Sequence, residues 1–209
     1  MQSPKIRALW AVVLSLVLSS ASAVAQDGGE EAPRELRDAY AVLLGLSPDG
    51  QAAERDGDAD IYRSRIANPK APRLVSRLEV SGNPCRARTF SVFQFPGRWA
   101  RLVVTITDLS RISAAVAYAS VDDLIAERNP VAIDDPDAVQ IVLTGEGLQC
   151  ASRLSLADEG QALRKEARTG EDNCRDRLDI PLMDEAQAER GRDALAVLAR
   201  ACRIGAIGG

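Results

Sequence analysis

Three aspartates at alternate positions form the pattern in this chain that most resembles a metal-binding loop. Asp56, Asp58 and Asp60 are spaced like the first three ligands of an EF-hand loop, whose carboxylates converge on one Ca²⁺. The rest of the motif is absent, because Ile61 occupies the position that requires glycine and Ala67 the position that requires a bidentate glutamate. We therefore interpret these aspartates as an acidic, solvated loop, and we predict no metal site and no cofactor.

A second group of acids contains Asp134, Asp135 and Asp137. Neighbouring carboxylates can hold a cation, or they can act as an acid and base pair as in glycoside hydrolysis. The tight spacing and the intervening Pro136 are instead typical of a turn, in which short acidic side chains bind nearby backbone N–H groups. We expect the turn.

Four arginines beside a tryptophan form the candidate binding surface. Arg86, Arg88, Arg98 and Arg101 lie on or near two neighbouring predicted strands, and Trp99 follows a Pro-Gly turn between them. If these side chains share one face of the sheet, their guanidinium groups can bind an anionic ligand or an acidic partner. An exposed tryptophan can anchor such a partner. The alternative is that the arginines pair with surface acids and that the tryptophan covers the core.

Histidine is absent from the chain, and several catalytic mechanisms are excluded with it. A Ser-His-Asp triad, a Cys-His pair and an HExxH zinc site all require imidazole. Gly145-Glu146-Gly147 begins like a dinucleotide-binding motif, but Cys150 stands where the last glycine belongs. No catalytic residue is predicted, and the only enzyme class that we retain is a hydrolase that uses two carboxylates.

Residues 1–25 have the organisation of a cleaved secretory signal peptide. Lys5 and Arg7 form a basic start, a long apolar stretch follows, and small residues including Ala23 and Ala25 suit signal peptidase. We expect cleavage after Ala25, with cleavage after Ala23 as the second choice and an uncleaved membrane anchor as the rival interpretation. The signal predicts a periplasmic or secreted protein.

The charge balance restricts the partners. The chain has 209 residues, and removal of Lys5 and Arg7 from its 26 basic residues would leave 24 against 30 acidic ones. An acidic protein is poorly suited to neutralise phosphates, so we expect no nucleic-acid partner. No later segment is long and apolar enough to span a bilayer, so we expect no stable membrane insertion after cleavage. The partner is predicted to be an envelope protein or a small ligand that the sequence does not identify.

The four cysteines are widely spaced, and none forms a CxxC pair. An even number in an exported chain predicts two disulfides, for which three connectivities exist. A strand from Cys174 and a helix ending at Cys202 would have similar lengths, roughly 26 and 27 Å. Because the connection between them is short, a helix that folds back along the strand would bring their far ends together. We therefore predict Cys174–Cys202, which leaves Cys85–Cys150.

The apolar periodicity predicts a helix near each end of the mature chain. Leu36, Tyr40 and Leu43 lie on one face of a helix over residues 34–46. Asp184 and Gln187 form a capping box that begins a second helix, which Gly205 ends.

Alternating apolar residues predict strands between these helices. The expected strands cover residues 73–80, 86–95, 102–107, 112–118, 139–143, 148–156 and 174–182. The expected connections are a polar segment over 51–72 with a helical turn near 61–66, a short helix over 121–128, a stop at 145–147 and a long loop over 157–173.

Neighbouring strands joined by short turns indicate an antiparallel sheet. We predict an α+β fold in which about seven strands form a curved sheet or open barrel, with an N-terminal helix and a C-terminal helix packed on it. The expected divisions are a signal peptide (1–25), a helix with a polar loop segment (26–72) and an antiparallel β domain with the final helix (73–209). The sequence favours an exported, non-catalytic binding or interaction module, and the alternative is the carboxylate-dependent hydrolase.

Overall fold

The computed structural model describes residues 32–57, 59–63, 70, 73–80, 82–94, 100–156, 164–166 and 173–205. The predictions for the signal peptide, Asp58, Arg98 and Trp99 fall outside these residues.

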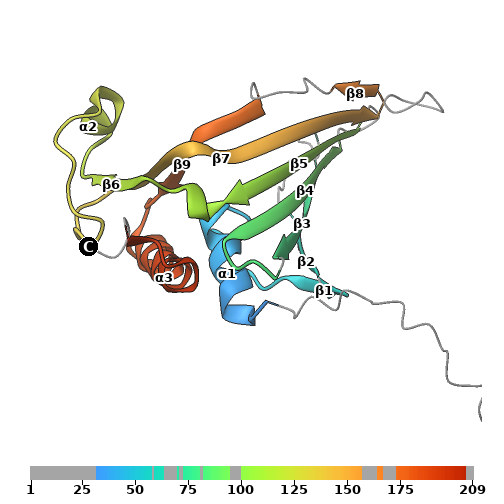
Figure 1. Ribbon diagram of the computed structural model, residues 1–209, viewed down its shortest axis with the longest axis horizontal. Coiled ribbons are helices and arrows are strands. Elements are labelled where there is room, and N and C mark those ends of the chain that lie inside the picture. The colour runs from blue at the N-terminus through green and yellow to red at the C-terminus, as the bar shows by residue number, and fades with distance from the viewer. Residues whose placement is uncertain are drawn as a thin grey trace, which may run out of the picture.

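Within the described residues, nine strands form one sheet against which two longer helices pack (Figure 1). The helices are α1 (Arg34–Leu43), α2 (Val121–Ala126) and α3 (Glu185–Cys202), with a 3-10 turn η1 (Leu109–Arg111). The strands are β1 (Glu54–Asp56), β2 (Ala59–Arg63), β3 (Arg73–Val80), β4 (Arg86–Gln94), β5 (Ala100–Asp108), β6 (Ala114–Tyr118), β7 (Gln140–Leu156), β8 (Arg164–Glu166) and β9 (Cys174–Pro181). Every pairing is antiparallel, in the order β1-β2-β3-β4-β5-β7-β6, and β8 and β9 also pair with β7. The predicted curved antiparallel sheet with two helices is therefore confirmed.

The two faces of the sheet differ because side chains alternate along each strand. In β4, Arg86 and Arg88 are exposed, whereas Ala87 and Thr89 are buried. The buried side chains point toward the inner face, which α1 and α3 cover. Leu78, Ile141, Leu143, Leu178 and Ile180 meet the helices there.

Both helices bury the faces that the sequence predicted. In α1, Leu36, Tyr40 and Leu43 are buried, and in α3 Leu195 and Leu198 are buried. The two helices also pack against each other beneath the sheet (Figure 1). This packing places the C-terminal end of α3 near α1 and not beside the start of β9.

The N-cap of α3 has the predicted form. Asp184 Oδ1 accepts a hydrogen bond from Gln187 N at 2.7 Å, and Gln187 Oε1 accepts one from Met183 N at 2.9 Å. The first bond satisfies a backbone N–H group that an isolated helix end leaves without a partner, and the second differs from a standard capping box because Gln187 binds the residue before the N-cap. The helix ends earlier than Gly205, since Arg203 adopts the left-handed conformation that closes it.

The expected loop over residues 51–72 contains two strands that the sequence did not indicate. β1 and β2 form a hairpin that extends the sheet beyond β3, and the helical turn expected near residues 61–66 is wrong for Ile61, Tyr62 and Arg63, which lie in β2. A buried ion pair holds this hairpin to α1: Arg37 Nε lies 2.8 Å from Asp60 Oδ2, and Arg55 Nη1 lies 2.8 Å from Asp60 Oδ1. Long-range pairing of this kind overrides weak local β-propensity.

The strand stop predicted at Gly145-Glu146-Gly147 is wrong, because this sequence bends a strand and does not end it. β7 runs through it for 17 residues, and its pairing with β9 shifts register between Thr144 and Gln149. Glycine is required at 145 because a Cβ atom there would lie 1.9 Å from the backbone oxygen of Arg111. Gly147 has a φ of +62°, a conformation that few other residues adopt. The two glycines thus allow the strand to change neighbours without ending.

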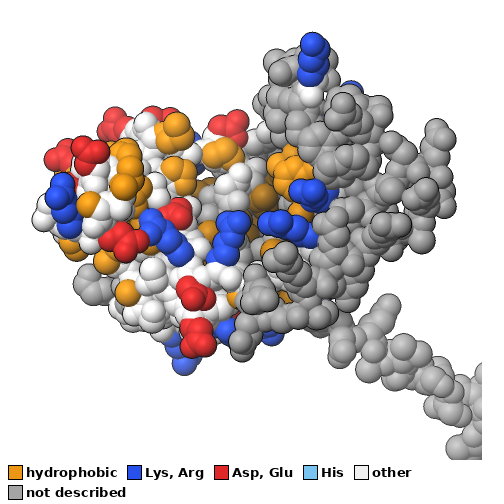
Figure 2. Space-filling view, turned by 90° about the horizontal axis from the view of Figure 1, so that it is seen from above, with side chains coloured by type: hydrophobic (Ala, Val, Ile, Leu, Met, Phe, Trp, Pro, Cys, Tyr) orange, Lys and Arg blue, Asp and Glu red, His pale blue; other side chains and the backbone are white. Residues whose placement is uncertain are grey.

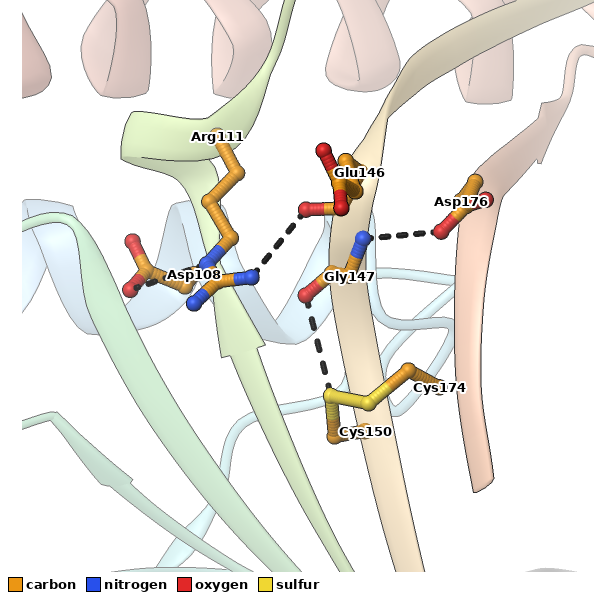
Figure 3. Close-up of a disulfide and its surroundings, with 7 residues drawn as sticks. All are labelled: Asp108, Arg111, Glu146, Gly147, Cys150, Cys174 and Asp176. Atoms are coloured by element: carbon orange, nitrogen blue, oxygen red, sulfur yellow. Dashed lines mark hydrogen bonds and ion pairs between the residues drawn. A yellow bond between two sulfur atoms is a disulfide. The ribbon is translucent and has the colours of Figure 1, made fainter. Parts of the chain in front are cut away.

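The predicted disulfide pairing is wrong. Cys150 and Cys174, which are 24 residues apart, are bonded to each other across β7 and β9 (Figure 3). Cys85 and Cys202 are free thiols. The prediction assumed that the final helix runs back along the last strand, but α3 packs against α1 and crosses the direction of β9 (Figure 1).

The disulfide lies next to the bend in β7. Gly147 N donates a hydrogen bond to Asp176 Oδ1 at 2.7 Å, and Arg111 Nη1 donates one to Glu146 O at 3.2 Å (Figure 3). These bonds hold the bend to β9 on one side and to η1 on the other.

None of the helices in the described part of the chain is both long and apolar enough to cross a membrane.

Candidate functional site

A cleft of about 570 Å³ lies between the end of α1, strands β2 and β3, and the start of α3. Its volume is within the range of small-molecule sites in proteins. Its walls come from four separate parts of the chain, represented by Gln51, Tyr62, Leu74 and Arg190. A second hollow of about 230 Å³ adjoins it and shares Gly45, Pro48 and Gln187.

The wall formed by residues 45–51 is held in a defined shape. Gly45 reverses the chain after α1 with a φ of +67°, and Ser47 Oγ donates a hydrogen bond to Gln51 O at 2.7 Å. Arg190 Nη2 donates to Pro48 O at 2.7 Å and so connects this wall to α3. The cleft is therefore fixed by bonds between elements far apart in the sequence.

The opposite wall comes from the N-terminal end of α3. Asp184 and Gln187 line the cleft while they cap the helix. Met183 lies at the same place with 83% of its surface exposed. A flexible apolar side chain at the rim of a cleft can adapt to ligands of different shapes.

The sheet side of the cleft is mostly apolar. Leu74, Ser76 and Tyr62 line it from β3 and β2. Burial, together with the nearby Asp60 carboxylate, raises the pKa of Tyr62 to about 12. Tyr62 therefore remains a neutral phenol at ordinary pH.

The charges around the cleft are balanced. Asp49 and Asp184 contribute carboxylates, and Arg63 and Arg190 contribute guanidinium groups. Arg63 is also paired with Glu54 at 3.1 Å on the exposed side of the hairpin. The Nε atom of Arg190 is buried and has no hydrogen-bond partner among the described residues.

The predicted arginine surface is divided between the two faces of the sheet. Arg88 lies opposite Ile106 in the β4–β5 register, so alternation places Arg101 on the other face from Arg86 and Arg88. Arg88 is 3.6 Å from Glu79 and lies over the Phe90 ring at 5.6 Å.

Arg86 also has an acidic neighbour, since its Nε lies 3.4 Å from Asp108. On the face that Figure 2 shows, Lys and Arg side chains are spread across the middle, and acidic side chains gather at the end that carries α2.

The two acidic clusters differ in their outcome: the solvated loop expected around Asp56 and Asp60 is wrong for Asp60, which lies buried in β2, whereas the turn expected at residues 134–137 is confirmed. Asp60 is buried between two guanidinium groups, and Asp56 lies on β1 with an exposed side chain. Asp135 Oδ1 accepts a hydrogen bond from Asp137 N at 2.8 Å, as expected for an acidic turn. In the part of the chain that the structure describes, no three Cys, Asp or Glu side chains are placed to hold a metal ion.

No pattern in the sequence indicated the cleft. The N-cap at Asp184 was the only local signal near it, and that signal indicated a helix start and not a binding wall. Gln51, Met183 and Arg190 carry no motif, and only the packing of α3 beside the turn after α1 brings them together.

Comparisons with protein-family models, with curated proteins and with solved structures find no match to this chain.

Proposed function

We propose that this protein is an exported binding domain that holds a small amphipathic ligand in the cleft between α1, β3 and α3. The observation that carries the proposal is the cleft itself, with its apolar sheet side and its balanced rim of two carboxylates and two guanidinium groups. Such a lining suits a ligand with an apolar part and charges of both signs, for example a short peptide.

Arg190 supports a ligand with a carboxylate or carbonyl oxygen. Its Nη2 is used by Pro48 O, but its buried Nε has no partner among the described residues. Arg190 lines the cleft, and a guanidinium group binds carboxylates through charge-assisted hydrogen bonds. The ligand is thus expected to place an oxygen against this guanidinium group.

Binding is favoured over carboxylate-dependent hydrolysis. That reaction needs a carboxylic acid that retains its proton, which apolar or like-charged surroundings provide. The cleft instead contains a guanidinium group for each carboxylate, and Asp184 Oδ1 already accepts the hydrogen bond that caps α3.

The test is a thermal-shift and calorimetric titration of the full chain with short zwitterionic peptides, uncharged peptides and simple carboxylates. A ligand that binds only the folded state at 100 times its Kd raises the free energy of unfolding by about 2.7 kcal/mol. We expect saturable binding by peptides that carry both an apolar side chain and a free carboxylate.

A variant that fills the cleft separates specific binding from surface adsorption. Gln51→Trp changes a side chain that lines the cleft, while the backbone oxygen that Ser47 contacts is kept. Val121→Trp is the matched control, because Val121 is 60% exposed on α2 and does not line the cleft. Binding should be lost in Gln51→Trp and kept in Val121→Trp. Equal binding by both variants, or no binding by any probe, would contradict the proposal.

Export is tested separately. The basic start, apolar stretch and small residues before position 26 support it, and a disulfide is compatible with an oxidising compartment. Intact-mass measurement of the exported protein should give a chain that starts at Gln26 or, as the second choice, Val24. A mass that includes residues 1–25 would mean that the segment is an anchor.

A further inference from the structure

Two free cysteines that are distant in the sequence lie together at the edge of the core. Cys85 is in the turn between β3 and β4, and Cys202 is the last residue of α3. Their side chains are close enough to interact, and Cys85 contributes to the raised pKa of the Cys202 thiol. This pair is neither the predicted one nor part of the cleft, so its chemistry requires a separate explanation.

Both cysteines are on rigid parts of the fold. Cys85 N donates to Asn83 Oδ1 at 3.0 Å, and Cys85 O accepts from Leu109 N at 2.8 Å. Cys202 follows Leu198 by one helical turn, and Leu198 is fully buried in the core. Because the fold already holds both residues in place, a bond between the two sulfur atoms requires little further loss of conformational freedom.

Tyr40 lies beside the pair and orders it. The Tyr40 hydroxyl donates a hydrogen bond to Pro84 O at 2.9 Å, directly before Cys85, and it also interacts with Cys202. Tyr40 itself is fully buried in α1. The thiols are thus held by three elements, namely α1, α3 and the β3–β4 turn.

The surroundings disfavour a thiolate but not a disulfide. Burial, followed by the interaction with Cys85, raises the pKa of the Cys202 thiol well above its usual value. A disulfide carries no charge, so it does not incur the desolvation cost that opposes ionisation. A buried neutral bridge is therefore compatible with this environment.

We propose that Cys85 and Cys202 form a second structural disulfide that joins the β3–β4 turn to the end of α3. The oxidant is a disulfide of the glutathione or thiol-oxidoreductase class. The Cys85 thiolate attacks this disulfide, which forms a mixed disulfide and releases one thiol. The Cys202 thiolate then attacks the Cys85 sulfur and releases the second thiol, so that two electrons and two protons pass to the oxidant.

The test is refolding of the full chain from denaturant in a buffer of reduced and oxidised glutathione, followed by acid quenching and non-reducing peptide mapping. Refolding gives the oxidant access to Cys202 before the core buries it. We expect one linked peptide pair containing Cys150 and Cys174 and another containing Cys85 and Cys202. Recovery of Cys85 and Cys202 as free thiols, as glutathione adducts or in any other pairing would overturn the proposal.

Matched double variants measure what this bridge does to stability. Cys150→Ser with Cys174→Ser leaves only the proposed pair, and its Tm should be higher in oxidising than in reducing buffer. The control is Cys85→Ser with Cys202→Ser, in which any redox dependence comes from Cys150–Cys174 alone. The buffer supplies the oxidant, so the outcome is independent of export and of ligand binding in the cleft. An unchanged Tm in the first variant, together with unlinked peptides in the wild type, would refute a structural bridge.

Discussion

Replacing Asp60 by asparagine should destabilise the protein more than any other single substitution of a charged residue in the β1–β2 hairpin. The carboxylate is 7% exposed and lies 2.8 Å from Arg37 Nε, whose side chain is 9% exposed. Arg55 contacts the other carboxylate oxygen, also at 2.8 Å, but its side chain is 35% exposed. Asp60→Asn keeps the shape of the side chain and removes its charge, so the buried Arg37 guanidinium loses the carboxylate that lies 2.8 Å from it.

The size of the destabilisation follows from the burial of Asp60 and Arg37. Removing one partner of a buried ion pair costs about 3–5 kcal/mol. We expect a value near the lower end, about 3 kcal/mol, because Arg37 Nη1 still donates to Ala32 O and Arg55 can turn toward water. In a protein of this size that loss lowers Tm by about 6–12 °C.

The assay is urea unfolding of the wild type and Asp60→Asn, with Glu54→Gln as the matched control. Glu54 and Arg63 form an ion pair in the same hairpin, but their side chains are 67% and 56% exposed. Breaking that pair should cost less than about 1 kcal/mol. The double variant Arg37→Met with Asp60→Leu removes both buried charges and should be more stable than Asp60→Asn. If Asp60→Asn costs no more than Glu54→Gln, the pair does not fasten α1 to the sheet.

Two further perturbations test other parts of the fold. Gly145→Ala should cost about 1–3 kcal/mol, because a methyl group there would lie 1.9 Å from the backbone oxygen of Arg111. Gly82→Ala, where no atom lies within 4 Å of the added methyl, is its control in the same unfolding assay. Stability should also fall as the pH rises from about 10 to 12, since burial raises the pKa of Tyr62 from 10.0 to about 12 and the unfolded chain therefore loses this proton first. In Tyr62→Phe the decline measured by unfolding at each pH should be shallower, and an unchanged slope would assign the effect to other groups.

The sequence predicted most of the secondary structure because its signals are local. Leu36, Tyr40 and Leu43 recur at helical spacing, and Asp184 caps α3 through a residue three positions away. The alternation in Leu102, Val104 and Ile106 likewise requires only neighbouring residues. Such patterns show which side of an element is apolar, and so they were sufficient for the antiparallel sheet with two helices.

Local patterns were insufficient where a segment takes its conformation from distant contacts. The hairpin of β1 and β2 has a polar sequence and is held by β3 and by the pair of Arg37 with Asp60. Gly145 resembles a strand stop, but the close approach of Arg111 makes it a bend within β7. In both places the deciding partner lies many residues away, and no local pattern indicates it.

The buried faces of the helices and strands follow from local apolar patterns, because a short period of apolar residues is enough to define a buried side. The pairing of Cys150 with Cys174 and the position of Cys85 beside Cys202 depend on how the elements pack. The same packing brings Gln51, Leu74 and Arg190 to one cleft. These outcomes depend on the direction in which α3 crosses α1 and on the register between β7 and β9. Crossing direction and register arise from the packing of the whole core, so they are not encoded in the spacing of any one segment.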